Sequence, residues 1–338
     1  MKAVRPVGIL GAAIIVALGA TVALAVTSGT AAPAGVGAAG AGLGTGAGSG
    51  AGAVSATAGT PSPAVIDAVA AENQYGNVVG QVGGQYVKVT SLLSNPNTDP
   101  HTFEASPQVA RAIADARLVV QNGLGYDSFM NSIEAASPGH GRQVITVQRL
   151  LGLPDSTANP HLWYSPGTMP AVAQAVAADL AGIDPAHAAY YRANASKFTR
   201  SLTSWYHSLA TLKAEDHAVP VATTEPVADY LLQAAGAVNA TPWAFQADIM
   251  NGVDPSPQDV ATERELLADR KVAALVYNDQ VTDPLTQSLI ALARASGVPV
   301  VGVYETMPQP GFDYQSWMLA ESNALKNAIT ARTSTEHL

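Results

Sequence analysis

Two histidines stand in nearly identical short motifs, and both have the character of metal ligands. His101 ends the tripeptide Asp99-Pro100-His101, and His161 ends Asn159-Pro160-His161. Proline fixes its own φ and restricts the residue before it, so each histidine is held on a stiff loop. One such tripeptide is ordinary for a surface turn, but two among only seven histidines are not. Because neutral imidazole is a common ligand of transition metals, the pattern indicates a metal site.

Two glutamates follow apolar stretches that are typical of buried strands. Glu225 comes just after residues 219–223, and Glu305 just after residues 298–303. Ligand sites in open α/β sheets lie beyond the carboxyl ends of the strands, where both glutamates are expected. Glu225 alone is equally consistent with a carboxylate that only complements a helix terminus, and Glu305 alone is more often a solvated carboxylate than a functional one. Asp279, at another strand end, is a second candidate for the position of Glu305.

Composition limits the remaining chemistry. The chain of 338 residues has no cysteine, which excludes disulfides, thiolate metal sites and a lipid-modified N-terminal cysteine. A metal site must therefore use His, Asp and Glu. The formal net charge of −9 argues against nucleic acid as a partner, since a basic stripe would be needed there.

Short apolar stretches alternate with helical ones, which predicts an α/β protein with mostly parallel sheets. Between the two series, apolar residues from Tyr190 to Leu212 recur mainly at steps of three and four, as on one helix face. We therefore expect two similar lobes, each a mostly parallel sheet flanked by helices, joined by one long spine helix. The expected N-terminal metal-binding lobe is 61–184, the connecting helix 185–214 and the C-terminal metal-binding lobe 215–338.

The N-terminal part has the character of an export segment. Two basic residues precede an uncharged, mainly apolar run from Val7 to Val26, and an Ala/Gly-rich stretch follows. We expect a signal peptide or an N-terminal membrane anchor at 1–28 and a flexible tether at 29–60. Both readings place the rest of the chain outside the cytoplasm, at the cell surface or in the periplasm.

From residue 66 to about residue 329 the chain resembles the metal-binding (zinc/manganese) solute-binding proteins of bacterial ABC transporters. Several short motifs carry this resemblance in the family's order, and they include Asp99-Pro100-His101, Asn159-Pro160-His161, Thr224-Glu225-Pro226 and Gly302-Val303-Tyr304-Glu305-Thr306. The resemblance implies a monomeric carrier, not an enzyme, that holds one metal ion between its lobes and delivers it to a membrane permease. It maps the ligands to His101, His161, Glu225 and Glu305.

The ligand types bear on the choice of metal. Two neutral histidines and two carboxylates balance the charge of one divalent ion, so the ion can be buried. Imidazole suits Zn²⁺ and Fe²⁺, and hard carboxylates move the preference towards Mn²⁺. We expect Mn²⁺ or Zn²⁺, with manganese slightly favoured and iron as a third option.

Two other functions use the same residues. A metal-dependent hydrolase would need a free general base beside the ion, and only Glu104, near His101, stands out. A binding protein for a small organic solute would need an aromatic-lined cleft, whereas aromatic residues make up 6% of the chain.

Overall fold

The computed structural model describes residues 65–95, 103, 106–137, 139, 141–215 and 218–338, all within one compact unit. No helix in these stretches is both long and apolar enough to cross a bilayer. The expected signal or anchor, the tether, His101 and Glu104 lie outside the described residues.

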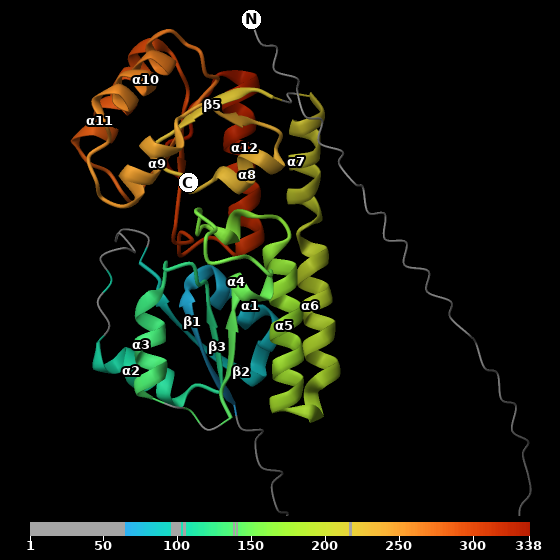
Figure 1. Cartoon of the computed structure of the whole chain (residues 1–338). Helices are drawn as coiled ribbons and strands as arrows, with labels where there is room; N and C mark the ends of the chain where they lie inside the picture. Colours follow the sequence, from blue (N-terminus) through green and yellow to red (C-terminus); the bar gives the residue numbers. More distant parts are fainter. Residues whose placement is uncertain (1–64, 96–102, 104–105, 138, 140, 216–217) are drawn as a thin grey trace, which may run out of the picture. The chain divides into compact units, whose positions relative to one another are not determined.

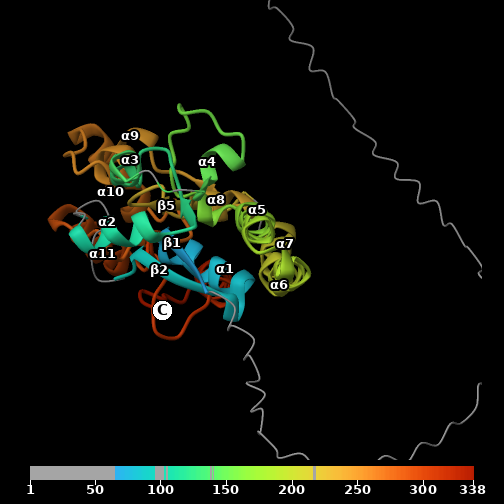
Figure 2. The same ribbon diagram turned by 90° about the horizontal axis from the view of Figure 1, so that it is seen from below.

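The first half forms an N-terminal lobe around a parallel four-stranded sheet. Its strands lie in the order β2-β1-β3-β4. They are β1 (Ile66–Glu72), β2 (Val87–Leu93), β3 (Leu118–Gln121) and β4 (Gln143–Thr146). The helices are α1 (Asn73–Gly83), α2 (Pro107–Asp115), α3 (Ser128–Ala136), α4 (Val147–Leu150), α5 (Thr168–Ile183) and α6 (Ala188–Ser201). Seen from below, α1, α5 and α6 lie to one side of the sheet, and α2 and α3 to the other (Figure 2).

The C-terminal lobe repeats this topology. Its parallel sheet has the order β6-β5-β7-β8, the same sequence of crossovers as in the first lobe. The strands are β5 (Pro220–Thr223), β6 (Val238–Asn239), β7 (Leu275–Asn278) and β8 (Val300–Val303). The helices are α7 (Thr203–Glu215), α8 (Asp229–Ala234), α9 (Trp243–Met250), α10 (Pro257–Ala268), α11 (Pro284–Ser296) and α12 (Tyr314–Ala331). The prediction of an α/β fold with two similar lobes is confirmed (Figure 1).

Alternation along the strands divides the interior into separate cores. Successive side chains of a strand point to opposite faces of a sheet. In β1, Ala68 and Ala70 join the largest core, whereas Val69 and Ala71 face α2 and α3. In β7, Val276 joins the largest core while its neighbours face α9, α10 and α11. The largest core runs through both lobes and along the spine.

The spine consists of two consecutive helices, α6 and α7, instead of one unbroken helix. At Leu202 the N–H bonds to the carbonyl of Thr199, a tighter three-residue spacing that interrupts the α-helix. Buried Phe198, Leu202 and Trp205 continue one apolar face across the break. α6 packs on α5 and α1 of the first lobe, and α7 on α12 of the second, so the spine connects the lobes.

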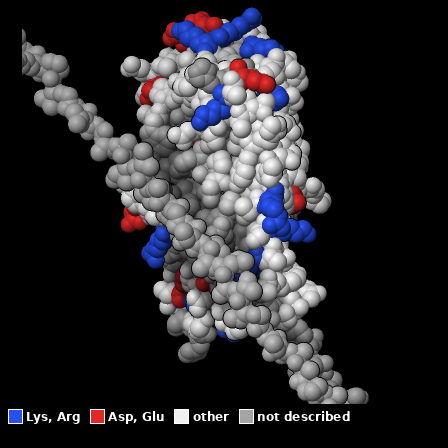
Figure 3. All heavy atoms as spheres, turned by 90° about the vertical axis from the view of Figure 1, so that its right-hand side faces the viewer, with Lys and Arg blue, Asp and Glu red and all other residues white. Residues whose placement is uncertain are grey.

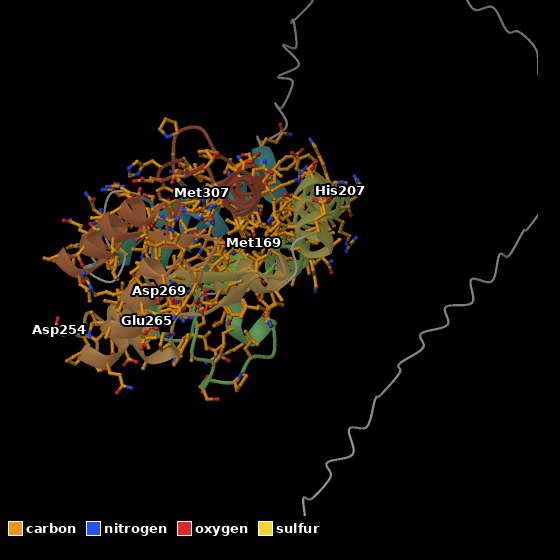
Figure 4. All side chains as sticks on the ribbon, turned by 90° about the horizontal axis from the view of Figure 1, so that it is seen from above. Met169, His207, Asp254, Glu265, Asp269 and Met307 are labelled. Atoms are coloured by element: carbon orange, nitrogen blue, oxygen red, sulfur yellow. The ribbon has the colours of Figure 1, made fainter. Side chains whose placement is uncertain are left out.

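Buried hydrogen bonds tie the two lobes together. Asn73, at the start of α1, donates to the carbonyl of Met307 and accepts from its N–H, at 2.8 and 3.0 Å. Tyr314, at the start of α12, donates to the carbonyl of Trp163 at 2.6 Å. Figure 4 shows Met307 and Met169 inside the body, whereas His207 lies at its edge. The lobes therefore meet through a packed and hydrogen-bonded interior.

Charged side chains are sparse on the surface. On the face that Figure 3 shows, the Lys and Arg side chains of the described residues stand in small separate groups among uncharged atoms. This distribution agrees with a charged fraction of only 13%.

Candidate metal site

His161 is the best-defined of the predicted ligands. The motif folds back on itself, because the side-chain oxygen Oδ1 of Asn159 accepts the His161 N–H at 3.0 Å. The same oxygen lies 2.8 Å from Nδ1 of the imidazole. An amide oxygen can only accept, so Nδ1 carries a proton, and Nε2 is the ring nitrogen that can bind a metal ion. Nε2 makes no hydrogen bond within the described residues, and the side chain is fully buried.

Glu305 faces this nitrogen from the other lobe. It follows β8, and its Oε2 lies 3.5 Å from Nε2 of His161, with both side chains fully buried. Tyr126 of the N-terminal lobe donates to the same oxygen at 2.7 Å. Burial first, and then the negative charge of Glu305, raise the pKa of the Tyr126 hydroxyl well above its usual value. Tyr126 therefore remains a protonated donor and holds Glu305 in place.

Tyr126 owes its position to a strained loop after β3. Gly123 and Gly125 adopt φ values of 87° and 82°, and Leu124 adopts 56°, a left-handed conformation that glycine tolerates best. The carboxylate of Asp127 closes the loop by accepting the N–H groups of Asn122 and Gly123. The glycines therefore permit the turn that brings Tyr126 to Glu305.

Glu225, like Glu305, follows the carboxyl end of a strand in the C-terminal sheet. It comes two residues after β5, is only 3% exposed, and its Oε1 accepts from the amide of Asn278 at 3.2 Å. The same amide nitrogen donates to Oε1 of Glu305 at 2.7 Å. Asn278 therefore joins the two predicted carboxylate ligands. Sequence reasoning missed this residue.

Asp279 points elsewhere. Its carboxylate accepts from the hydroxyl of Tyr277 at 2.8 Å and contacts Nδ1 of His337 at 3.0 Å. Asn278 and Asp279 are neighbours at the end of β7, so their side chains point to opposite faces. The structure thus brings Asn278, and not Asp279, to the glutamates.

The site joins the two lobes. Asn159, which orients His161, also donates to the carbonyl of Pro226 at 2.7 Å, next to Glu225. The hydroxyl of Tyr230 in α8 donates to the carbonyl of Asn159 at 2.9 Å. Asp229 lies nearby; burial raises its pKa, and the hydrogen bond from Asn239 and the proximity of His161 partly offset that increase. A surface pocket of about 470 Å³, lined in part by Tyr126, Pro160 and Trp243, opens beside the site.

The described residues supply only part of a metal-binding set. Among them, no three His, Asp or Glu side chains are gathered closely enough to hold an ion. The pair His161 and Glu305 comes together, and Asn278 connects Glu225 to it. His101 lies outside the described residues. The remaining donor set of imidazole and buried carboxylates fits a divalent transition metal.

Comparison with known proteins agrees with this fold. The family model described as zinc-uptake complex component A, periplasmic, matches residues 68–328. The manganese-binding lipoprotein MntA of Bacillus subtilis is 23% identical over 253 residues, covering 71% of this chain and 79% of the relative. The manganese ABC transporter substrate-binding lipoprotein PsaA of Streptococcus pneumoniae serotype 4 is 21% identical over 258 residues, covering 71% and 80%.

Solved structures show the same fold. A crystal structure of ZnuA has a TM-score of 0.64 at 22% identity and covers 79% of this chain and 100% of its own. FpvC from Pseudomonas aeruginosa, solved with Mn²⁺, has a TM-score of 0.64 at 22% identity and covers 79% and 99%.

Two similar α/β lobes with buried imidazole and carboxylate groups between them define a binding protein for a metal ion. The chain belongs to the family of zinc-uptake complex component A, the periplasmic metal-binding proteins of ABC transporters. The family resemblance seen in the sequence is thereby confirmed. The relatives are substrate-binding proteins and not enzymes, so the hydrolase alternative is set aside.

Proposed function

We propose that this protein captures one Mn²⁺ or Zn²⁺ ion outside the cytoplasmic membrane and delivers it to the permease of an ABC importer. The ligands proposed are His101 and His161 from the N-terminal lobe and Glu225 and Glu305 from the C-terminal lobe. The proposal extends to this chain what the names of its relatives state, namely manganese binding and ABC transport.

The observation that carries the proposal is the approach of His161 to Glu305. Nε2 of the buried imidazole faces a buried carboxylate oxygen at 3.5 Å, and no hydrogen bond joins the two atoms. The other ring nitrogen is fixed by an amide, as is usual for metal-binding histidines. A cation between the two atoms would satisfy both, and two histidines with two carboxylates would neutralise its charge.

Release of the ion requires the site to open. The hydrogen bonds between Asn73 and Met307 and between Tyr314 and Trp163 oppose a large separation of the lobes. We propose instead that loop movement around His101 or Glu305 releases the ion while the spine stays rigid. Hydrogen exchange measured with and without metal tests this: protection changes belong to these loops, and a change along α6 and α7 contradicts it.

Thermal unfolding of metal-stripped protein tests the capture step. Stoichiometric Mn²⁺ or Zn²⁺ raises the melting temperature because the ion binds only the folded chain, and excess EDTA reverses the increase. An organic-solute receptor would be indifferent to both additions. No increase with either ion, for wild-type protein that is folded by circular dichroism, contradicts the proposal.

A further inference from the structure

Asn278 occupies a central place in the candidate site. It ends β7, which lies between β5 and β8 in the sheet, and its side chain is only 1% exposed. Glu225 follows β5 and Glu305 follows β8, so the two glutamates flank Asn278. This explains geometrically how one amide nitrogen reaches a carboxylate oxygen of each.

The orientation of the amide is fixed from its other end. Oδ1 of Asn278 accepts the backbone N–H of Gln280 at 3.1 Å. The backbone N–H of Asn278 donates to Oγ1 of Thr224 at 3.1 Å, which anchors the strand end. Because a backbone N–H needs an acceptor, the amide oxygen must face Gln280 and the NH₂ group must face the glutamates. Each of its two hydrogens therefore serves one carboxylate.

Each of the two hydrogen bonds occupies one carboxylate oxygen of a glutamate. Both go to Oε1, at 3.2 Å for Glu225 and 2.7 Å for Glu305. The opposite oxygen of Glu305, Oε2, is the one that faces His161, and the hydroxyl of Tyr126, which donates to it, holds it in that position. Hydrogen bonds to an ionised carboxylate are strong, so a metal ion that takes both oxygens of either glutamate must compete with Asn278.

We propose, on the basis of the proposed function, that Asn278 is a specificity-determining residue that restricts each glutamate to one metal-binding oxygen. One oxygen from each glutamate keeps the number of carboxylate ligands at two, which suits the four-ligand, tetrahedral preference of Zn²⁺. Mn²⁺ favours six ligands and needs the second carboxylate oxygens. Asn278 therefore moves the balance towards zinc, against the slight preference for manganese that the ligand types alone suggest.

Asn278→Ala removes both hydrogen bonds and leaves the proposed ligands in place. Purified wild-type and variant proteins are stripped of metal, and the dissociation constants for Mn²⁺ and Zn²⁺ are measured by competition with a chromophoric chelator. Co²⁺ reports coordination number, because its visible band is intense with four ligands and weak with six. Asn194→Ala is the matched control: its amide donates to the carbonyl of Val82 at 3.0 Å, away from the glutamates.

The inference predicts an intense four-coordinate cobalt band for wild type and for the Asn194 variant. For Asn278→Ala it predicts a weaker band and a shift of relative affinity towards Mn²⁺ of about tenfold, as expected when a charge-assisted hydrogen bond stops competing. A six-coordinate spectrum in wild type, or an unchanged spectrum and affinity ratio in the variant, overturns the inference and leaves the proposed function standing.

Failure of the proposed function gives a different result, since wild type then binds none of the three ions. If circular dichroism shows that the Asn278→Ala protein is unfolded, Asn278→Ser replaces it. A serine hydroxyl has one proton and can donate to only one carboxylate. We therefore expect smaller changes in the cobalt band and in the relative affinity for Mn²⁺. Their absence in a folded serine variant also overturns the inference.

Discussion

Nε2 of His161 lies 3.5 Å from Oε2 of Glu305, although the two residues belong to different lobes. If one ion joins them, His161→Ala weakens Mn²⁺ and Zn²⁺ binding more than about a hundredfold, beyond the effect usual for residues that only support a ligand. In the double variant with Glu305→Gln, the loss of binding free energy is smaller than the sum of the losses in the two single variants, because both changes alter one site. Isothermal titration of both single variants and the double variant checks this, and strictly additive losses contradict a shared ion.

Asn159 is predicted to act through His161. Asn159→Ala removes the acceptor for Nδ1 and frees the imidazole to rotate, which lowers metal affinity by about 10- to 100-fold. Asn159→Asp keeps an acceptor for Nδ1 but loses the hydrogen bond to the carbonyl of Pro226, so it restores part of the affinity. Titration of both variants distinguishes this role from a general loss of stability, since equal losses for Ala and Asp contradict it.

Tyr126 is predicted to hold Glu305 by one hydrogen bond. Tyr126→Phe removes only the hydroxyl that donates to Oε2, so metal affinity falls by about tenfold while the fold persists. Tyr206→Phe is the control, because its hydroxyl donates to the carbonyl of Pro166, outside the site. Metal titration of the two variants checks the difference, and equal affinity in both would contradict the assigned role.

The sequence predicted the fold more fully than the site. Strong apolar stretches marked β1, β3, β7 and β8, because buried parallel strands are apolar on both faces. The two-residue β6 carries no such pattern, and the break at Leu202 leaves the apolar face of the spine unchanged, so neither could be foreseen.

The sequence also predicted only some of the residues at the site. His161 was predicted because the Pro-His motif occurs twice in the chain, and Glu305 because it directly follows an apolar stretch typical of a strand. Asn278 was missed because its amide does not ionise and Asp279 beside it drew attention instead. Only the register of β7 decides which of these neighbours faces the glutamates, and a shift of one residue would reverse the result.

Glu321 gives the protein a pH dependence that does not involve the metal. It is buried in α12, where its Oε1 accepts from Tyr164 at 2.9 Å and from the indole of Trp317 at 2.7 Å. Burial raises its pKa from 4.5 to about 8, and these hydrogen bonds only partly oppose the increase. Between the two values the folded state keeps a proton that the unfolded state has lost.

The free energy of unfolding that Glu321 contributes is therefore complete below pH 4.5 and is lost as the pH rises through about 8. Glu321→Gln removes this contribution to the pH dependence of the free energy of unfolding. Urea unfolding of metal-free protein at pH 5.5 and 8.5 is expected to show a smaller loss of stability in the variant than in wild type. Equal losses in the two proteins contradict the prediction.

The most direct test of metal capture is to count the ions bound. Stripped protein is dialysed to equilibrium against Mn²⁺ and against Zn²⁺, and bound metal is measured by mass spectrometry, for wild type and for a variant with His101→Ala, His161→Ala, Glu225→Gln and Glu305→Gln. We expect one ion per wild-type chain and none in the folded variant. Wild type without stoichiometric metal, or a variant that still binds one ion, would contradict it.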